Sequence, residues 1–214
     1  MVHIVHPEDR WLYTTYLEQM YRQRYRVAVE HYGWKLPNAE NGYDKDQFDT
    51  DRTIYLLAID ETSKALIGSM RLNPTLEPHM MSEVFSDLCT FQGVPRSENI
   101  WEGSRLILDK TACPKEQFHH ARIRLSAAMN EICLQMNISH VTWMTHKLLY
   151  TMALKRWPTK PLGTPTYFED DDATYIAAIS EMTEGALQGL RDSLPEGDRV
   201  SVTVAPLDLI RKVA

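Results

Sequence analysis

Ionisable side chains stand at positions of this 214-residue chain where the neighbouring residues predict burial. Arg24 lies on an apolar stripe at helical spacing, and Arg71 follows a strand-like apolar run. Glu102 and Arg105 lie together in the segment NIWEGSRLILD. Because an unpaired buried charge is costly, these groups should meet each other or a ligand. A buried Glu–Arg pair adds little net stability, so a strand that carries Trp, Glu, Ser and Arg together favours a functional site.

An acidic loop precedes one of the predicted strands. Residues 44–51 read DKDQFDTD, which is either a solvated turn or a carboxylate array for a cationic or amine-bearing ligand. A calcium loop of the EF-hand type needs an oxygen ligand at the fifth position and glycine at the sixth, where this chain has Phe48 and Asp49. The spacing therefore excludes that metal site.

A cationic stretch occupies residues 146–160, HKLLYTMALKRWPTK, which contains no acidic residue. The chain as a whole has 23 basic and 29 acidic residues and a net charge of −6, so the stretch stands out locally. It is either an exposed helix face or a docking surface for a phosphorylated or acidic partner. Its four cations are Lys147, Lys155, Arg156 and Lys160.

The elements that must position these residues follow from hydrophobic periodicity. The N-terminal helix should bury Tyr13, Leu17, Met20, Arg24 and Ala28, and the long central helix Ala121, Leu125, Met129, Ile132 and Met136. Gly103, in the middle of a strand, suggests a bulge or a close backbone approach. We expect strands at 2–6, 53–59, 65–72, 99–109, 139–145, 164–168 and near 201, and helical segments at 10–32, 81–88, 115–136, 146–157 and ending near 194. This order predicts a mixed sheet covered by helices.

Length and composition narrow the class of protein. The ratio 214/150 is about 1.4, which favours a single α/β domain. The acidic balance argues against a general nucleic-acid binder, and no apolar run reaches the ~20 residues of a membrane span. We expect a reduced, cytoplasmic protein, because the three cysteines form no close pair and no signal peptide is recognisable. No phosphate-binding GxxxxGK[ST] or GxGxxG motif is present.

Five stretches in order, from about residue 21 to 157, resemble the LuxI-type acyl-homoserine-lactone synthases, the autoinducer synthases of bacterial quorum sensing. They are Arg24 with Gly33-Trp34, DKDQFD leading into TIYLLAID, GSMRLNPT, MMSEVFSDL and IWEGSRLILD. The resemblance implies a single GNAT-like N-acyltransferase domain over residues 1–214, with a mixed twisted sheet, splayed central strands and flanking helices. It also implies acyl transfer from acyl-carrier protein or acyl-CoA to the amine of S-adenosylmethionine, then lactonisation and release of methylthioadenosine, without a prosthetic group or metal.

The resemblance also implies roles for individual residues. Glu102 would be the general base, and Thr142 would line the acyl tunnel. Arg24 and Trp34 would belong to the adenosylmethionine pocket, and Phe85 would be part of its wall. The loop carboxylates Asp46 and Asp49 would hold adenosylmethionine. Arg71 and Arg105 would belong to the ion-pair lattice that shapes the site. The family usually has Phe where this chain has Ala28, and Glu where it has Asp44, so the aromatic wall near Arg24 differs.

Two further roles follow from the chemistry of acyl transfer. A tetrahedral oxyanion needs a hydrogen-bond donor, and we expect it in the backbone at Gly103 and Ser104. The acyl chain must be shielded from water, and Trp143, Met144 and Met152 are apolar side chains near Thr142.

Two other functions stay open at this point. A GNAT-like acetyltransferase acting on another amine would be expected to carry [QR]xxGx[GA] on a strand-to-helix turn, which is absent. A non-catalytic adenosylmethionine or acyl sensor finds support only in the loss of the aromatic residue at position 28. The residues do not distinguish the two acyl donors, since both are anionic.

Overall fold

The chain, as a computed structural model, is described over residues 1–169 and 172–195. It divides into two units. Among the described residues, the first comprises 1–71, 105–129 and 191–195, and the second comprises 72–104, 130–169 and 172–190. Strands β5 (Leu66–Pro74) and β6 (Ile100–Leu108) and helix α3 (Lys115–Gln135) contribute to both units. The single domain over residues 1–214 stays a prediction.

The first unit contains the strand expected at 53–59 and most of the strand expected at 65–72, which are neighbours in the sheet. Strand β1 (Val2–Val5) pairs antiparallel with β4 (Ile54–Ile59), and the order continues through β5 to β6. The Asp60 N–H donates to the Ala65 carbonyl at 2.9 Å across the turn. Every residue of β4 is buried. Burial on both faces explains why this strand reads as a continuous apolar run rather than an alternating one.

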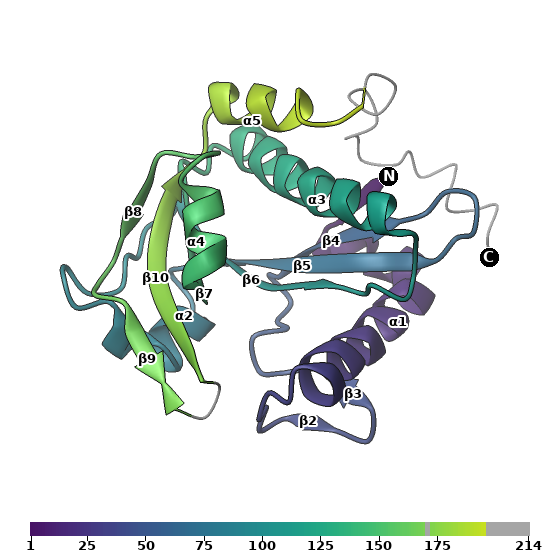
Figure 1. The fold of residues 1–214 in the computed structure, drawn as a ribbon, viewed down its shortest axis with the longest axis horizontal. Helices are drawn as coiled ribbons and strands as arrows, with labels where there is room; N and C mark the ends of the chain where they lie inside the picture. Colours follow the sequence, from purple (N-terminus) through teal and green to yellow (C-terminus); the bar gives the residue numbers. More distant parts are fainter. Residues whose placement is uncertain (170–171, 196–214) are drawn as a thin grey trace. The chain divides into compact units, whose positions relative to one another are not determined.

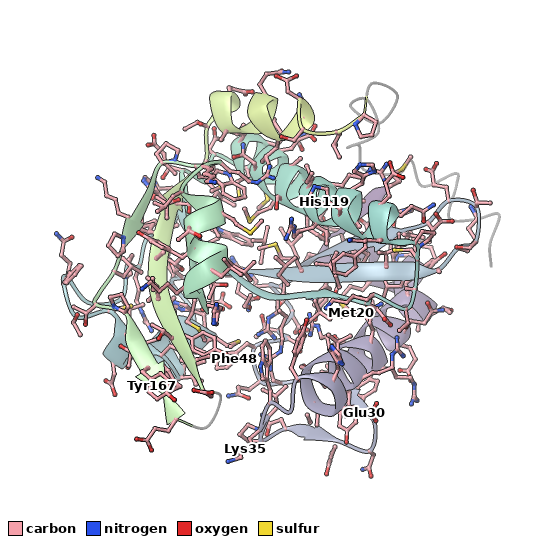
Figure 2. The ribbon with its side chains drawn as sticks, in the orientation of Figure 1. Met20, Glu30, Lys35, Phe48, His119 and Tyr167 are labelled. Atoms are coloured by element: carbon pink, nitrogen blue, oxygen red, sulfur yellow. The ribbon has the colours of Figure 1, made fainter. Side chains whose placement is uncertain are left out.

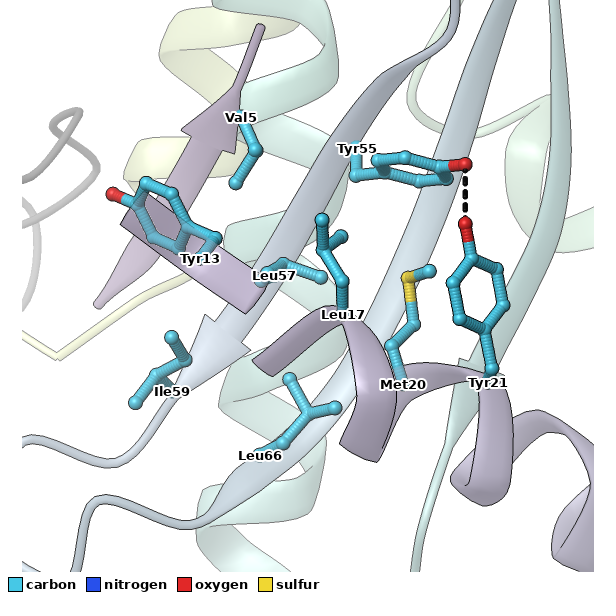
Figure 3. Packing of buried hydrophobic residues seen from close by; sticks show 9 residues of the cluster. All are labelled: Val5, Tyr13, Leu17, Met20, Tyr21, Tyr55, Leu57, Ile59 and Leu66. Atoms are coloured by element: carbon cyan, nitrogen blue, oxygen red, sulfur yellow. Dashed lines mark hydrogen bonds between the residues drawn. The ribbon is translucent and has the colours of Figure 1, made fainter. Parts of the chain in front are cut away.

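The predicted helix over 10–32 consists of three consecutive segments. They are a 3-10 helix at Pro7–Tyr13, helix α1 at Thr14–Arg24 and a π-helix at Tyr25–His31. All five residues of the predicted stripe are buried, including Met20, which is labelled in Figure 2. Their apolar members Tyr13, Leu17 and Met20 pack against β4 in the cluster of Figure 3. The helical face was therefore predicted correctly and the helix type was not.

Residues 35–52 contain a short ribbon rather than only loop. Strand β2 (Ala39–Glu40) pairs with β3 (Tyr43–Asp44) across Asn41 and Gly42, both of which have positive φ. An Asn-Gly pair is a strong signal for this two-residue turn, so the ribbon could have been predicted. Because β3 packs against α1, the ribbon carries Asp44 into a buried position.

The second unit contains a mixed sheet in the order β6-β7-β10-β8, with β9 beside β10. Strand β6 is parallel to β7, whereas β10 is antiparallel to β7. The β6–β7 pairing ends at Glu102 and Thr142 although both strands continue, which is the splay that the resemblance implies. Helix α4 lies against β7 and β10 (Figure 1). The bounds are β7 His140–His146, α4 Lys147–Ala153, β8 Thr159–Pro161, β9 Thr166–Phe168, β10 Ala173–Glu181, α2 Met80–Glu83 and a 3-10 turn Ser86–Leu88.

The described elements differ from the expected ones in several places. Strands β8 and β10 were not predicted, and the C-terminal helical segment is restricted to α5 (Glu184–Arg191). The β10 segment ATYIAAISE is misleading, because a short apolar run with alanines suits a buried helix as well as a buried strand. Met136 follows the end of α3 and is 38% exposed, so it is not part of the buried stripe. The strand expected near residue 201 lies outside the described residues.

The described helices include none with the length and apolar character needed to cross a membrane. Cys89, Cys113 and Cys133 are not in disulfides.

Candidate functional site

Asp49 is the central anion of an ion-pair chain in the first unit. Its Oδ1 accepts a hydrogen bond from Arg24 Nη1 at 3.0 Å and lies 3.1 Å from Arg71 Nη1. The side chains of all three residues are fully buried. Burial opposes ionisation of Asp49, but the two guanidinium groups and the Asp46 N–H together lower its pKa well below the usual value. Asp49 is therefore an anion at neutral pH.

Asp46 extends the chain toward Asp44. Arg71 donates to both oxygens of Asp46, at 2.5 and 3.3 Å. Arg105 Nη2 donates to Asp46 Oδ2 at 2.9 Å, and its Nε donates to Asp44 Oδ2 at 3.0 Å. Three arginines thus alternate with three aspartates, and their formal charges cancel.

This pairing excludes one of the two interpretations of the acidic loop, the solvated turn. The Asp44 and Asp49 side chains are at most 1% exposed, so a solvated turn is excluded. The structure brings together the predicted residues Arg24, Asp46, Asp49, Arg71 and Arg105. The carboxylate oxygens of Asp46 and Asp49, however, face guanidinium and N–H groups of the protein itself. In this arrangement the loop holds the arginines in place.

Phe48 anchors the loop between the two aspartates. It is 3% exposed, and the Arg71 guanidinium lies 5.9 Å from its ring centroid (Phe48 is labelled in Figure 2). The Phe48 N–H donates to Asp46 Oδ1 at 2.9 Å, and the Asp46 N–H donates to Asp49 Oδ2 at 3.0 Å. Sequence reasoning used Phe48 only to exclude calcium and missed this packing role.

A backbone irregularity in β6 lies next to the predicted oxyanion donor. Arg105 has φ 53°, a left-handed conformation that costs a non-glycine residue about 1 kcal/mol or more. The sequence predicted a bulge at Gly103, two residues earlier. Ser104 is half-buried immediately before this irregularity. The hydrogen bonds of Arg105 to Asp44 and Asp46 offset its strain.

The end of the π-helix places Trp34 in the first unit. Gly33 has φ 71°, and the Trp34 N–H donates to the Ala28 carbonyl at 2.9 Å. Ala28 is fully buried in a cluster with Val27, against which Trp34 packs. Trp34 therefore packs where this chain has Ala28 in place of the family's aromatic residue. Tyr32, an alternative filler, is instead 52% exposed and stacks on Trp34.

Glu102 and Thr142 are register partners in the second unit, at the point where β6 and β7 separate. Glu102 is 2% exposed, and its Oε2 accepts a hydrogen bond from the Met81 N–H at 2.5 Å. Its Oε1 is buried and has no hydrogen-bond partner among the described residues. Thr142 is fully buried and donates to the Trp101 carbonyl at 3.4 Å. A buried carboxylate oxygen without a partner is suited to accept a proton from a ligand.

The predicted apolar residues of the second unit are only partly brought together. Phe85 and Met144 pack against one buried cluster, which includes Met81. Trp143 lies on the opposite face of β7, because alternate residues of a strand point to opposite sides. Its indole N–H donates to Ser180 Oγ at 2.9 Å. Trp143 therefore does not share a surface with Met144.

The cationic stretch lies in the second unit around α4. Lys147, Lys155 and Lys160 are exposed, as are the apolar side chains of Leu148 (65%) and Leu154 (47%). The helix therefore presents both positive charge and apolar surface to solvent.

No three His, Cys, Asp or Glu side chains within residues 1–169 and 172–195 are grouped so that they could hold a metal ion. The carboxylates of Asp44, Asp46 and Asp49 pair with guanidinium groups instead.

Comparison with known proteins identifies the family. The autoinducer synthase family model matches residues 9–185. The isovaleryl-homoserine lactone synthase of Bradyrhizobium diazoefficiens is 32% identical over 199 residues, 91% of this chain and 85% of that protein. The structure of BjaI, a CoA-dependent acyl-homoserine lactone synthase with SAM and isopentyl-CoA, has a TM-score of 0.81 and 29% identity, covering 99% of this chain and 97% of BjaI. MesI, another CoA-dependent synthase, has a TM-score of 0.77 and 26% identity over 90% of this chain and 94% of its own.

These matches confirm the fold class inferred from the resemblance, an α/β N-acyltransferase fold with a mixed sheet and flanking helices. They favour the synthase over an acetyltransferase or a non-catalytic sensor. The chain belongs to the autoinducer synthase family and is an acyltransferase of the acyl-homoserine-lactone synthase type.

Proposed function

We propose that this synthase transfers an acyl group from coenzyme A to the amine of S-adenosylmethionine, with Glu102 as the general base. The observation that carries the proposal is the Glu102 carboxylate, buried with one oxygen held by Met81 and the other without a partner. The amine of adenosylmethionine is protonated at neutral pH and must lose a proton before it can attack a thioester. The unpaired Oε1 can accept that proton, directly or through a water molecule.

The arginine–aspartate chain would bind adenosylmethionine through its arginines. Arg24 Nη1 pairs with Asp49, but its Nε and Nη2 are buried and make no hydrogen bond among the described residues. A guanidinium with unused donors suits a carboxylate or hydroxyl oxygen of a ligand. In this proposal Asp46 and Asp49 orient the arginines and contribute to binding indirectly. Trp34 would supply an apolar wall within the first unit.

The exposed lysines of the second unit would meet the acyl donor. Coenzyme A carries phosphate groups, and the exposed side chains of Lys147, Lys155 and Lys160 have the complementary charge. The similarity to two synthases described as CoA-dependent favours coenzyme A over acyl-carrier protein. The similarity to an isovaleryl-homoserine lactone synthase favours a short branched acyl group, with Thr142 and Met144 as lining residues.

The test compares the two donors directly. The purified chain receives adenosylmethionine with either isovaleryl-CoA or isovaleryl-acyl-carrier protein, and methylthioadenosine and the lactone are measured by mass spectrometry. We expect kcat/KM at least 10-fold higher with the CoA thioester. Turnover with isovaleryl-acyl-carrier protein but not with isovaleryl-CoA would overturn the choice of donor. Absence of methylthioadenosine with either thioester would overturn the proposed function.

A Lys155→Glu variant tests the docking surface, with Lys110→Glu as the control at an exposed lysine of the first unit. The first should raise KM for the CoA thioester, and the control should leave it unchanged. Equal KM values for the CoA thioester in both variants would contradict the assignment of Lys155 to the donor-binding surface.

A further inference from the structure

We propose that Tyr55, supported by Tyr21, is a positioning residue for adenosylmethionine binding that acts through Asp49 and Arg24. The inference rests on the proposed function, because it assigns Arg24 a place in the substrate site. It adds two tyrosines to which the resemblance assigns no role, although Tyr55 lies within the stretch TIYLLAID.

The direction of the hydrogen bonds is fixed by chemistry. The Tyr55 hydroxyl donates to Asp49 Oδ1 at 3.0 Å, since an ionised carboxylate can only accept. The Tyr21 and Tyr55 hydroxyl oxygens lie 2.9 Å apart (dashed line in Figure 3). Because Tyr55 has already used its one proton, Tyr21 must be the donor. The chain therefore runs from Tyr21 to Tyr55 to Asp49.

Burial keeps this chain in one protonation state. Tyr55 is fully buried and Tyr21 is 6% exposed. Burial, followed by the charge of Asp49, raises the pKa of both hydroxyl groups above the usual value. Both tyrosines are thus neutral donors whenever Asp49 is an anion.

The same two tyrosines also contact the cation of the pair. The Arg24 guanidinium carbon lies 5.4 Å from the Tyr21 ring centroid and 5.6 Å from the Tyr55 ring centroid. Both distances are in the range of cation–π attraction. The tyrosines therefore hold Asp49 by a hydroxyl group and Arg24 by two ring faces.

A third contact fixes Tyr55 and the acidic loop together. Arg10 Nη2 donates to the carbonyl groups of Thr50 and Thr53 at 2.6 and 2.7 Å. Its guanidinium carbon lies 5.1 Å from the Tyr55 ring centroid. Arg10 therefore connects Thr50 and Thr53, on the C-terminal side of Asp49, to the ring of Tyr55.

This arrangement has a functional consequence beyond packing. Arg24 has unused donors at Nε and Nη2, and their direction depends on where Asp49 holds Nη1. A binding group must be held to within about 0.5 Å of its productive position to act fully. Loss of the Tyr55 hydroxyl leaves the Arg24–Asp49 charge pair and the Asp46 N–H bond intact, but removes one of the donors that orient the Asp49 carboxylate.

The experiment compares three single hydroxyl deletions in one buried cluster: Tyr55→Phe, Tyr21→Phe and Tyr13→Phe. Tyr13 is the matched control, because it is 2% exposed, belongs to the same cluster and has its hydroxyl 3.0 Å from His3 Nδ1. For each we measure the Kd of adenosylmethionine by calorimetry, KM and kcat for methylthioadenosine release, and the melting temperature.

We expect Tyr55→Phe to raise Kd and KM for adenosylmethionine about 10-fold with a smaller change in kcat. Tyr21→Phe should raise them about threefold, because Tyr55 keeps its bond to Asp49. Tyr13→Phe should leave both values within twofold of the wild type while lowering the melting temperature to a similar extent.

An unchanged Kd in Tyr55→Phe, or an equal rise in Tyr13→Phe, would overturn the positioning role. If Tyr55→Phe does not fold, Tyr21→Phe decides, and an unchanged Kd there overturns the proposal. A wild-type chain that binds adenosylmethionine but releases no methylthioadenosine would instead count against the proposed function, since the Kd comparison does not depend on turnover.

Discussion

Replacing Asp49 by asparagine removes one negative charge from a site where both cationic partners are fully buried. Arg71 keeps Asp46, at 2.5 Å. Arg24 loses the one carboxylate with which it pairs in the described part of the chain. Breaking a buried ion pair in this way typically costs 3–5 kcal/mol, because a desolvated charge is left without compensation. We therefore expect Asp49→Asn to lower the free energy of unfolding by about 4 kcal/mol.

The assay is urea denaturation at pH 7, followed by tryptophan fluorescence. Glu83→Gln is the control, because Glu83 and Arg96 are 3.7 Å apart and their side chains are 48% and 46% exposed. An exposed pair of this kind contributes about 0–1 kcal/mol. A loss below about 1 kcal/mol in Asp49→Asn, equal to that of the control, would refute the reasoning.

A second variant tests whether the unpaired charge of Arg24 causes the loss of stability in Asp49→Asn. The double variant Arg24→Met with Asp49→Leu removes both charges of the pair, so position 24 carries no unpaired cation. Apolar replacement of a whole buried pair is often neutral or stabilising. The double variant should therefore be more stable than Asp49→Asn, and a lower stability would show that the unpaired charge is not the cause of the loss.

Two further predictions concern stability. Gly33→Ala should destabilise the chain by about 1 kcal/mol in the same urea assay, because φ is 71° and an added Cβ would meet no atom within 4 Å, so the cost is that of the backbone alone. An unchanged stability would show that the left-handed turn is not required before Trp34. Burial, aided by the N-terminal charge and Lys64, lowers the pKa of His3 from 6.5 to about 4. Between pH 4 and 6.5, His3 is therefore protonated in the unfolded chain but neutral in the folded chain. Acidification through this range should lower the free energy of unfolding by up to about 3 kcal/mol. His3→Asn should flatten this pH dependence, and an unaltered slope would assign it to other groups.

The parts of the fold that the sequence predicts are those whose burial produces a pattern. The stripe from Tyr13 to Ala28 gives a helical period, and the run at 54–59 gives a strand buried on both faces. Strand β10 has no clear period, because its short apolar run with alanines suits a helix as well as a strand, so it was not predicted. The π-helical segment was not predictable, because its hydrogen bonds depend on packing in the folded chain.

The site shows a similar division. Residue types and order pointed to Arg24, Arg71, Asp46 and Asp49, but not to their pairing. Arg24 and Asp49 are separated by 25 positions, and Arg105 and Asp44 by 61, so only the folded chain shows that the carboxylates face arginines. The sequence analysis therefore assigned the aspartates to a cationic ligand. Tyr55 was missed for another reason, since one polar atom within the apolar run TIYLLAI carries no local signal.

The most direct test of the catalytic assignment is the turnover of Glu102→Gln, because glutamine can still accept the Met81 N–H bond but cannot take up a proton from an ammonium group. General-base catalysis is typically worth 10²–10⁴-fold. We predict a kcat for methylthioadenosine release at least about 100-fold below the wild type, with the Kd of adenosylmethionine within about threefold. A kcat equal to that of the wild type would contradict the account and remove Glu102 from the mechanism.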